Sequence, residues 1–219
     1  MRKAICLIWI LSMIGCKNQT PTLSEFSHER QSTIHSLEST ANCKGPGGLY
    51  RTYVYSDQKG NLIFTQDFDY KDSFSAKVDS TGQAYVLDSL GMANDSLSYA
   101  VREMMQSHAF HWIHLFPEFI IQDYKTDLIA HSSDDNQVHF NANDQMGNPL
   151  HLVFDNKTDL LSSFTLQNMF DTTELINCYY TNYRESRYGP MVQDVMIVQA
   201  NRDTFNFEFT SVKINGESI

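Results

Sequence analysis

The sequence has few basic side chains and no long apolar run. Its 219 residues include 16 lysines and arginines against 26 aspartates and glutamates, a formal net charge of −10. Such an acidic surface repels nucleic acid and anionic lipid headgroups, so we expect no nucleic-acid partner. The most apolar stretch, residues 4–14, is far shorter than the roughly 20 residues of a transmembrane helix. We therefore expect no retained membrane-spanning helix.

Motifs of the common enzyme classes are also missing. The sequence contains no GxSxG elbow, HExxH helix, P-loop or dinucleotide-binding glycine fingerprint. The glycine-rich segment 45–48 lacks the Lys-Ser/Thr of a phosphate loop and precedes a predicted strand, which favours a turn. We expect no enzymatic activity and no cofactor. A hydrolase that uses a histidine and carboxylate cluster is the enzymatic alternative.

Histidines and acidic side chains raise the question of a metal site. Three histidines in segment 108–114 are three residues apart, so they would spread around a helix instead of sharing one face. His131, His139 and His151 lie on separate predicted strands, where only the tertiary structure can bring them together. The acidic segment 134–136 lacks the spacing of an EF-hand loop. The sequence therefore predicts no metal site.

The N-terminal residues follow the order of a secretory signal peptide. Residues 2–3 are basic, residues 4–14 are apolar, and Gly15 places a small residue directly before Cys16. A charged head, an apolar centre and a small-residue cleavage site define such a segment. We expect residues 1–15 to be a signal peptide that is removed from the mature chain.

The end of this segment, Met13-Ile14-Gly15-Cys16, resembles the lipobox of bacterial lipoproteins. In that family the cysteine becomes the acylated first residue, and the position three before it is usually leucine, from which Met13 departs. The resemblance implies a membrane anchor on Cys16, where each buried methylene contributes about 0.8 kcal/mol. The alternatives are a plain secretory signal and a short membrane anchor. Removal of residues 1–15 would leave 204 residues with a formal charge of −12, because two basic side chains are lost.

Two further cysteines, Cys43 and Cys178, remain in the mature chain besides Cys16. An exported protein matures where disulfides persist. A bridge between the two would close a loop of about 135 residues and add roughly 4 to 5 kcal/mol of stability on the chain-entropy model. We expect a Cys43–Cys178 disulfide, with two buried free thiols as the alternative. No CxxC pair is present, which argues against a zinc knuckle or a thioredoxin-type site.

The pattern of apolar residues predicts a mainly β domain over residues 24–219, preceded by a polar tether at 16–23. Helical spacing indicates an amphipathic helix at 23–39 and one or two helices at 95–115. Period-two alternation around turns predicts strands at 49–55, 61–68, 74–78, 84–87, 119–124, 128–131, 138–141, 150–154, 161–166, 175–183, 192–199 and 205–214. The fold class is α+β, with a single curved antiparallel sheet.

This order of elements resembles the periplasmic lipoprotein carrier and receptor proteins of the Lol system, the LolA/LolB-like family. The resemblance covers about residues 24–214. It rests on three sequence segments, which are 152–160 (LVFDNKTDL), 179–184 (YYTNYR) and 207–215 (FEFTSVKIN). The family implies an open half-barrel with helices in its mouth and a concave apolar lining that holds acyl chains. It implies no shared function by itself.

The candidate lining is the apolar segment 109–119, which would act as a lid. Its ligand-binding residues would be Phe110, Trp112, Ile113, Leu115, Phe116 and Phe119. The sequence thus predicts a cell-envelope lipoprotein, anchored at the periplasmic face of the outer membrane, that binds a lipid or a lipidated protein. The alternative is a structural or interaction lipoprotein in which these side chains fill the barrel as ordinary core.

Overall fold

The computed structural model describes ten parts of the chain, namely residues 21–26, 33–68, 73–96, 115–116, 128, 130–143, 149–168, 171, 173–200 and 202–219. These parts form a 3-10 helix, η1 (Leu23–Phe26), and fourteen strands. The strands are β1 (Ser36–Gly45), β2 (Gly48–Asp57), β3 (Leu62–Phe68), β4 (Phe74–Val78), β5 (Ala84–Leu87), β6 (Ala93–Ser96), β7 (Ser132–Ser133), β8 (Gln137–Asn143), β9 (Pro149–Asp155), β10 (Leu161–Gln167), β11 (Leu175–Arg184), β12 (Met191–Gln199), β13 (Asp203–Ile214) and β14 (Glu217–Ser218).

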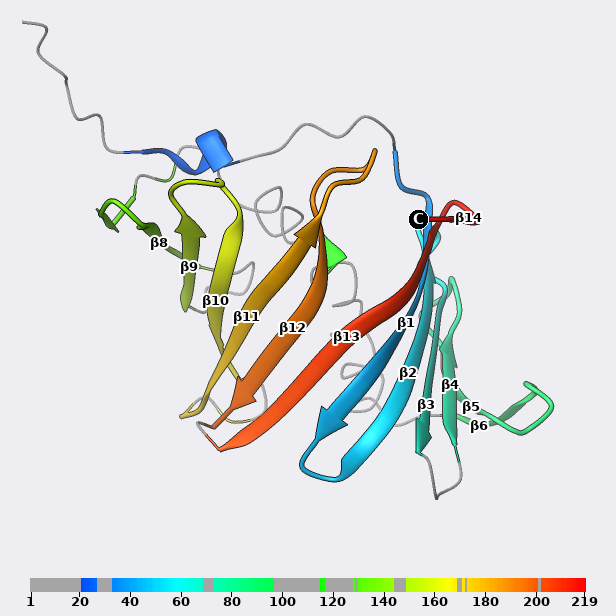
Figure 1. Ribbon diagram of the computed structural model, residues 1–219. Coiled ribbons are helices and arrows are strands. Elements are labelled where there is room, and N and C mark those ends of the chain that lie inside the picture. The colour runs from blue at the N-terminus through cyan, green and yellow to red at the C-terminus, as the bar shows by residue number, and fades with distance from the viewer. Residues whose placement is uncertain are drawn as a thin grey trace, which may run out of the picture.

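All strands belong to one antiparallel sheet, in the order β6-β5-β4-β3-β2-β1-β13-β12-β11-β10-β9-β8-β7, with β14 paired to β13. The sheet is open, because β6 and β7 lie at opposite ends of this order. Its two meanders are joined by β1 and β13, which come from opposite ends of the chain (Figure 1). Lys213 on β13 donates a 2.6 Å hydrogen bond to its cross-strand neighbour Glu38 on β1. The mainly β, single-sheet prediction is confirmed.

Three hairpin turns of the first meander share one sequence pattern, Asp-x-x-Gly. At each turn the aspartate Oδ1 accepts backbone N–H groups two and four residues later, as Asp57 does from Lys59 and Asn61 at 2.9 and 3.0 Å. Asp79 and Asp88 make the same bonds. The glycines, at 60, 82 and 91, have φ between +76° and +84°, a region that a residue without Cβ enters at little cost. Hydrogen bonds between residues at most four positions apart therefore define these turns.

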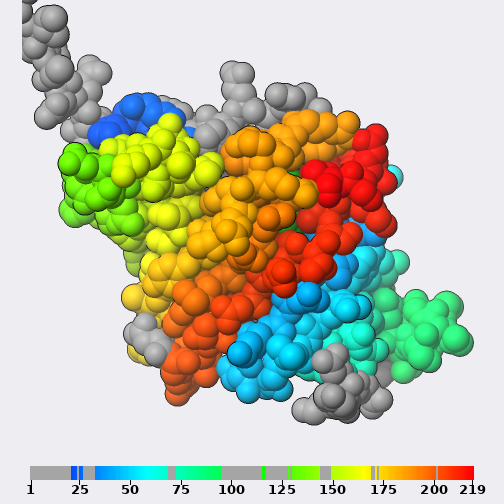
Figure 2. Space-filling model, viewed as in Figure 1, coloured from blue at the N-terminus to red at the C-terminus, as the bar shows by residue number. Residues whose placement is uncertain are grey.

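Side chains alternate between two faces of the sheet, and the buried ones lie on what we term the inner face. On β8 the even-numbered residues, Val138, Phe140 and Ala142, are buried, and the odd-numbered residues are exposed or half-buried. The larger apolar cluster extends over β1 and β8 to β13 and includes η1. A smaller one covers β2 to β5, around Val54 and Phe64. The opposite, outer face is turned toward the viewer in Figure 2.

Two predictions about elements are wrong. Within the predicted helix 23–39, residues 23–26 form the 3-10 turn η1, residues 33–35 are not helical and residues 36–39 begin β1, whereas residues 27–32 lie outside the described residues. Residues 128 and 130 are not in a strand, and the edge strand there is the two-residue β7. The predicted helices at 95–115 lie largely outside the described residues, but their first residue, Asp95, belongs to β6. The predicted strand 119–124 also lies outside the described residues.

Candidate functional site: the inner face of the sheet

The inner face carries two continuous rows of apolar side chains. Residues that pair directly across an antiparallel ladder lie on the same face, with Cβ atoms about 4.5 to 5.5 Å apart. The strand register therefore aligns one row across six strands from β3 to β11, made of Phe68, Tyr50, Cys43, Phe207, Val195 and Tyr180. A second row crosses six strands from β13 to β8, made of Phe205, Ile197, Cys178, Phe164, Leu152 and Phe140.

The two rows differ in burial from one end to the other. Leu152 and Phe140 have no exposed surface, and Phe140 packs edge-to-face against Phe26 of η1 with the ring centroids 5.6 Å apart. At the other end, Tyr50, Phe68, Phe205 and Phe207 are only half-buried; we term these four side chains the aromatic end. The aromatic end is thus apolar surface that the folded chain leaves partly uncovered.

Gly45, at the β1–β2 turn, leaves room for two side chains of the aromatic end to pack against the backbone. A Cβ added at Gly45 would lie 2.9 Å from Phe205 Cδ1 and 3.4 Å from Tyr50 Cε1, closer to Phe205 than packed carbons approach. Burial, and to a smaller extent the neighbouring Cys43, raises the pKa of the Tyr50 phenol to about 12. Apolar contact rather than acid-base chemistry is what these residues offer.

The predicted lining segment 109–119 is described only at two positions. Leu115 and Phe116 have no exposed surface and pack into the larger cluster on the inner face. In Figure 1 the short green segment 115–116 lies behind β11 and β12, on the side away from the viewer. The other four predicted ligand-binding residues, Phe110, Trp112, Ile113 and Phe119, lie outside the described residues.

The predicted disulfide is not formed. Cys43 and Cys178 are both free thiols, buried on the inner face. Strands β13 and β12 lie between β1 and β11, which places those two strands about 14 Å apart at the usual strand spacing. The register aligns Cys43 with Tyr180 and not with Cys178. A disulfide needs Cα atoms less than about 7 Å apart. Burial raises the pKa of the Cys43 thiol to about 11 and raises that of Cys178 further, so both remain protonated.

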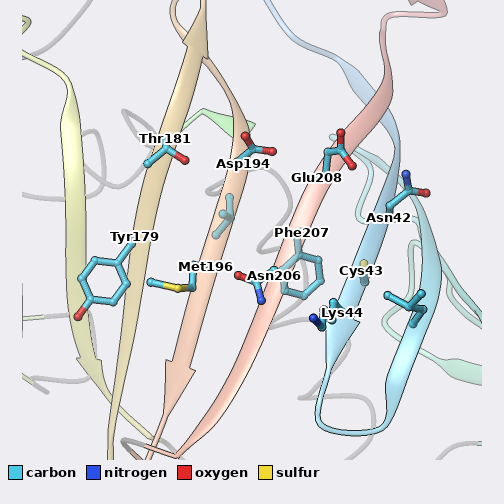
Figure 3. Close-up of a pocket in the computed structure, with 12 residues that line it drawn as sticks. Asn42, Cys43, Lys44, Tyr179, Thr181, Asp194, Met196, Asn206, Phe207 and Glu208 are labelled. Carbon is cyan, nitrogen blue, oxygen red and sulfur yellow. The ribbon is translucent and has the colours of Figure 1, made fainter.

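The outer face carries a shallow hollow of about 470 Å³ across β11, β12, β13, β1 and the first residues of β2 (Figure 3). Tyr179 and Met196 lie in one row with Asn206 and Lys44, and Leu49 ends that row. The carboxylates in the next row, Asp194 and Glu208, are direct cross-strand neighbours. The residues that line this hollow come from five strands that the register alone aligns, so the local sequence pattern does not predict it.

Two of the strand histidines meet on the outer face of β8 and β9. His139 Nδ1 lies 3.1 Å from His151 Nε2, and His151 Nδ1 lies 2.8 Å from Asn141 Oδ1. Burial and then the neighbouring His139 and His131 lower the pKa of His151. Among the described residues, no three His, Cys, Asp or Glu side chains are grouped closely enough to hold a metal ion. The segment 108–114, with three more histidines, lies outside these residues.

The acidic segment 134–136 forms a turn. Asp134 Oδ1 accepts the backbone N–H groups of Asn136 and Gln137 at 2.7 and 2.8 Å. These bonds from backbone N–H groups lower the pKa of the Asp134 carboxyl. Its oxygen therefore organises the β7–β8 turn.

A solved structure shares the arrangement of this chain. A LolA superfamily protein from Nitrosomonas europaea superposes with a TM-score of 0.55 at 11% sequence identity, covering 88% of this chain and 90% of its own. The chain has the LolA fold. A DUF1329 family protein from Desulfovibrio piger gives a TM-score of 0.49 at 10% identity, covering 84% of this chain and 88% of its own. A domain from Vibrio parahaemolyticus, described as an outer membrane lipoprotein-sorting protein, gives 0.47 at 9% identity, covering 87% of this chain and 88% of its own.

No protein-family model and no curated protein matches the sequence. At such identities the LolA likeness establishes the arrangement of the chain and leaves its ligand to be argued from the residues. In the described part of the chain, no helix is both long and apolar enough to cross a membrane.

Proposed function

We propose that the protein is a cell-envelope lipoprotein that binds a lipid, or the lipid moiety of a lipidated protein, on the inner face of its open sheet. The observation that carries this proposal is the pair of apolar rows on a LolA fold, ending in four half-buried aromatic side chains. A sheet that stays open cannot cover its own apolar face by closing into a barrel. The exposed part of the inner face is therefore available to an apolar ligand.

The energetics favour an acyl chain over a polar ligand. Each Å² of apolar surface removed from water contributes about 25 cal/mol, and acyl chains consist almost wholly of such surface. The aromatic end supplies flat, rigid side chains that contact methylene groups. The predicted lining residues 110–119 would cover the acyl chain from the other side. The described rows contain no charged side chain that would oppose an apolar ligand.

The anchor belongs to the same proposal. Residues 1–15 act as the signal peptide, Cys16 carries the lipid, and residues 16–23 form a short polar tether to the domain at 24–219. The acidic mature surface gives little attraction to anionic headgroups, so the acylated cysteine holds the protein at the periplasmic face of the outer membrane. Such a location would place the inner face within reach of membrane lipids and of other lipoproteins.

A second candidate function is a structural or interaction lipoprotein whose interior is filled. The complete burial of Leu115 and Phe116 favours it, since these two predicted lining residues already pack as core. In that case the inner face would bind no ligand, and the partner would dock elsewhere.

Probe binding separates the two candidates. Native mass spectrometry of gently purified protein should show a co-purifying acyl-bearing ligand. A fluorescent fatty-acid probe should then bind the delipidated protein saturably. Trp112→Ala and Phe116→Ala should weaken probe binding. The urea midpoint of each variant measures any loss of stability.

The matched control is Tyr179→Ala, which removes an aromatic side chain from the outer face. It should leave probe affinity unchanged. Absence of saturable binding to the wild-type protein, together with a loss of stability of roughly 3 to 5 kcal/mol in Phe116→Ala, would instead support the filled interior.

A further inference from the structure

A pair of histidines on the outer face has the geometry of a metal site. His139 on β8 and His151 on β9 are diagonal neighbours across the antiparallel ladder, since His151 pairs directly with Asn141 and His139 with Val153. Their ring nitrogens His139 Nδ1 and His151 Nε2 are 3.1 Å apart, and the rings are tilted by 32°. Both side chains are half-buried, so a solute can reach them from the outer face.

This separation matches two ligands of one transition-metal ion. With metal–nitrogen bonds of about 2.0 to 2.1 Å, two imidazole nitrogens lie about 2.8 Å apart at a right angle and about 3.3 Å apart at the tetrahedral angle. The observed distance falls between these values. An ion could therefore enter with small side-chain movements and no change in the backbone of either strand.

Asn141 selects the tautomer of His151 that ligation requires. Its Oδ1 lies 2.8 Å from His151 Nδ1 and accepts a hydrogen bond from the N–H there, which leaves the lone pair on His151 Nε2, the nitrogen next to His139. A histidine that binds a metal through one ring nitrogen usually donates the N–H of the other to such an oxygen, which sets its tautomer and ring plane. Asn141 is thus a positioning residue.

We propose that His139 and His151 bind one divalent transition-metal ion of the zinc and copper class, through His139 Nδ1 and His151 Nε2. Without metal, His139 Nδ1–H donates to His151 Nε2. Metal entry breaks that hydrogen bond, and the proton moves through solvent to His139 Nε2, so both imidazoles remain neutral. Two protein ligands leave the remaining coordination positions to water. Imidazole nitrogen selects zinc, copper and nickel over calcium and magnesium, which prefer oxygen ligands.

Titration of the untagged full chain tests the proposal, with Zn²⁺ and Cu²⁺ as probes and Ca²⁺ as the negative control. Calorimetry should show one site for Zn²⁺ or Cu²⁺ and no heat for Ca²⁺, and the electron paramagnetic resonance spectrum of the Cu²⁺ complex should show two coordinated nitrogens. His139→Ala and His151→Ala should each weaken that site by about tenfold or more. Asn141→Leu should weaken it by about tenfold, the usual effect of removing an outer-shell partner.

His35→Ala is the matched control, because His35 lies before β1 and hydrogen-bonds with Gln58 at 3.1 Å, away from this pair in the sheet order. It should bind metal as the wild type does. Circular dichroism of each variant confirms that the fold is kept. Unchanged affinity in the His139→Ala/His151→Ala double variant would overturn the proposal. So would loss of the site only on replacing His108, His111 and His114.

Discussion

Truncating one phenylalanine at each end of the inner face should give very different losses of stability. Phe140 is fully buried, with its ring 5.6 Å from that of Phe26 and 5.7 Å from that of Phe154. Phe140→Ala should therefore cost about 4 kcal/mol of unfolding free energy, within the range for buried Phe→Ala changes. Phe207 is half-buried at the aromatic end, so Phe207→Ala should cost only about 1 to 2 kcal/mol.

Urea unfolding followed by circular dichroism measures both losses. With a urea slope of about 2 kcal/mol per molar, the midpoint should fall by about 2 M for Phe140→Ala and by less than about 1 M for Phe207→Ala. Tyr179→Ala, on the outer face and 40% exposed, should stay within about 0.5 kcal/mol of wild type. Equal losses for the two phenylalanines would refute the inference that the aromatic end is incompletely covered. Phe207→Ala should also weaken the fatty-acid probe, whereas a normal probe affinity would remove Phe207 from the proposed site.

Three further predictions concern the anchor, the thiols and the turns. Cys16→Ser should abolish acyl labelling and release the chain from membranes, and acylation that persists in this variant would contradict the anchor. Alkylation of unfolded, unreduced protein should modify both Cys43 and Cys178, whereas recovery of a Cys43–Cys178 linked peptide would show that the sheet order is wrong. Asp155 accepts backbone N–H bonds from Lys157 and Thr158, which lower its pKa, so its contribution is present above the unfolded pKa of about 3.9 and is lost as pH falls through the lower folded value. The stability difference between wild type and Asp155→Asn should therefore shrink from pH 5 toward pH 2, and a constant difference would argue against the bond.

Local sequence patterns determined most of the strands. Strand β8 alternates apolar and polar residues without exception, and a two-residue period places one set of side chains on one face whatever the strand's neighbours are. The Asp-x-x-Gly turns likewise follow from hydrogen bonds within five residues. The third such turn, Asp88-Ser89-Leu90-Gly91, has the same pattern, and attention to that repeat would have revealed the hairpin of β5 and β6.

The first strand shows where local patterns fail. The inward-facing residues of β1 are Leu37, Ser39, Ala41 and Cys43, and three of these are small or polar. Their alternation carries little hydrophobic contrast, so the sequence favoured a helix. Residues 36–45 become a strand because β13 and β2 pair with them on both sides, and β13 begins more than 150 residues later in the chain. Non-local pairing overrides weak local preference.

The sequence by itself determined the charge, the candidate lipid anchor, the turns and which residues of most strands share a face, because each depends on neighbours in the chain. Only the tertiary structure decided which residues of different strands are neighbours. The sheet order separates Cys43 from Cys178, and the register aligns the two apolar rows and brings His139 to His151. Strand order and register depend on pairing between segments far apart in sequence, and a shift by one residue would exchange the two faces.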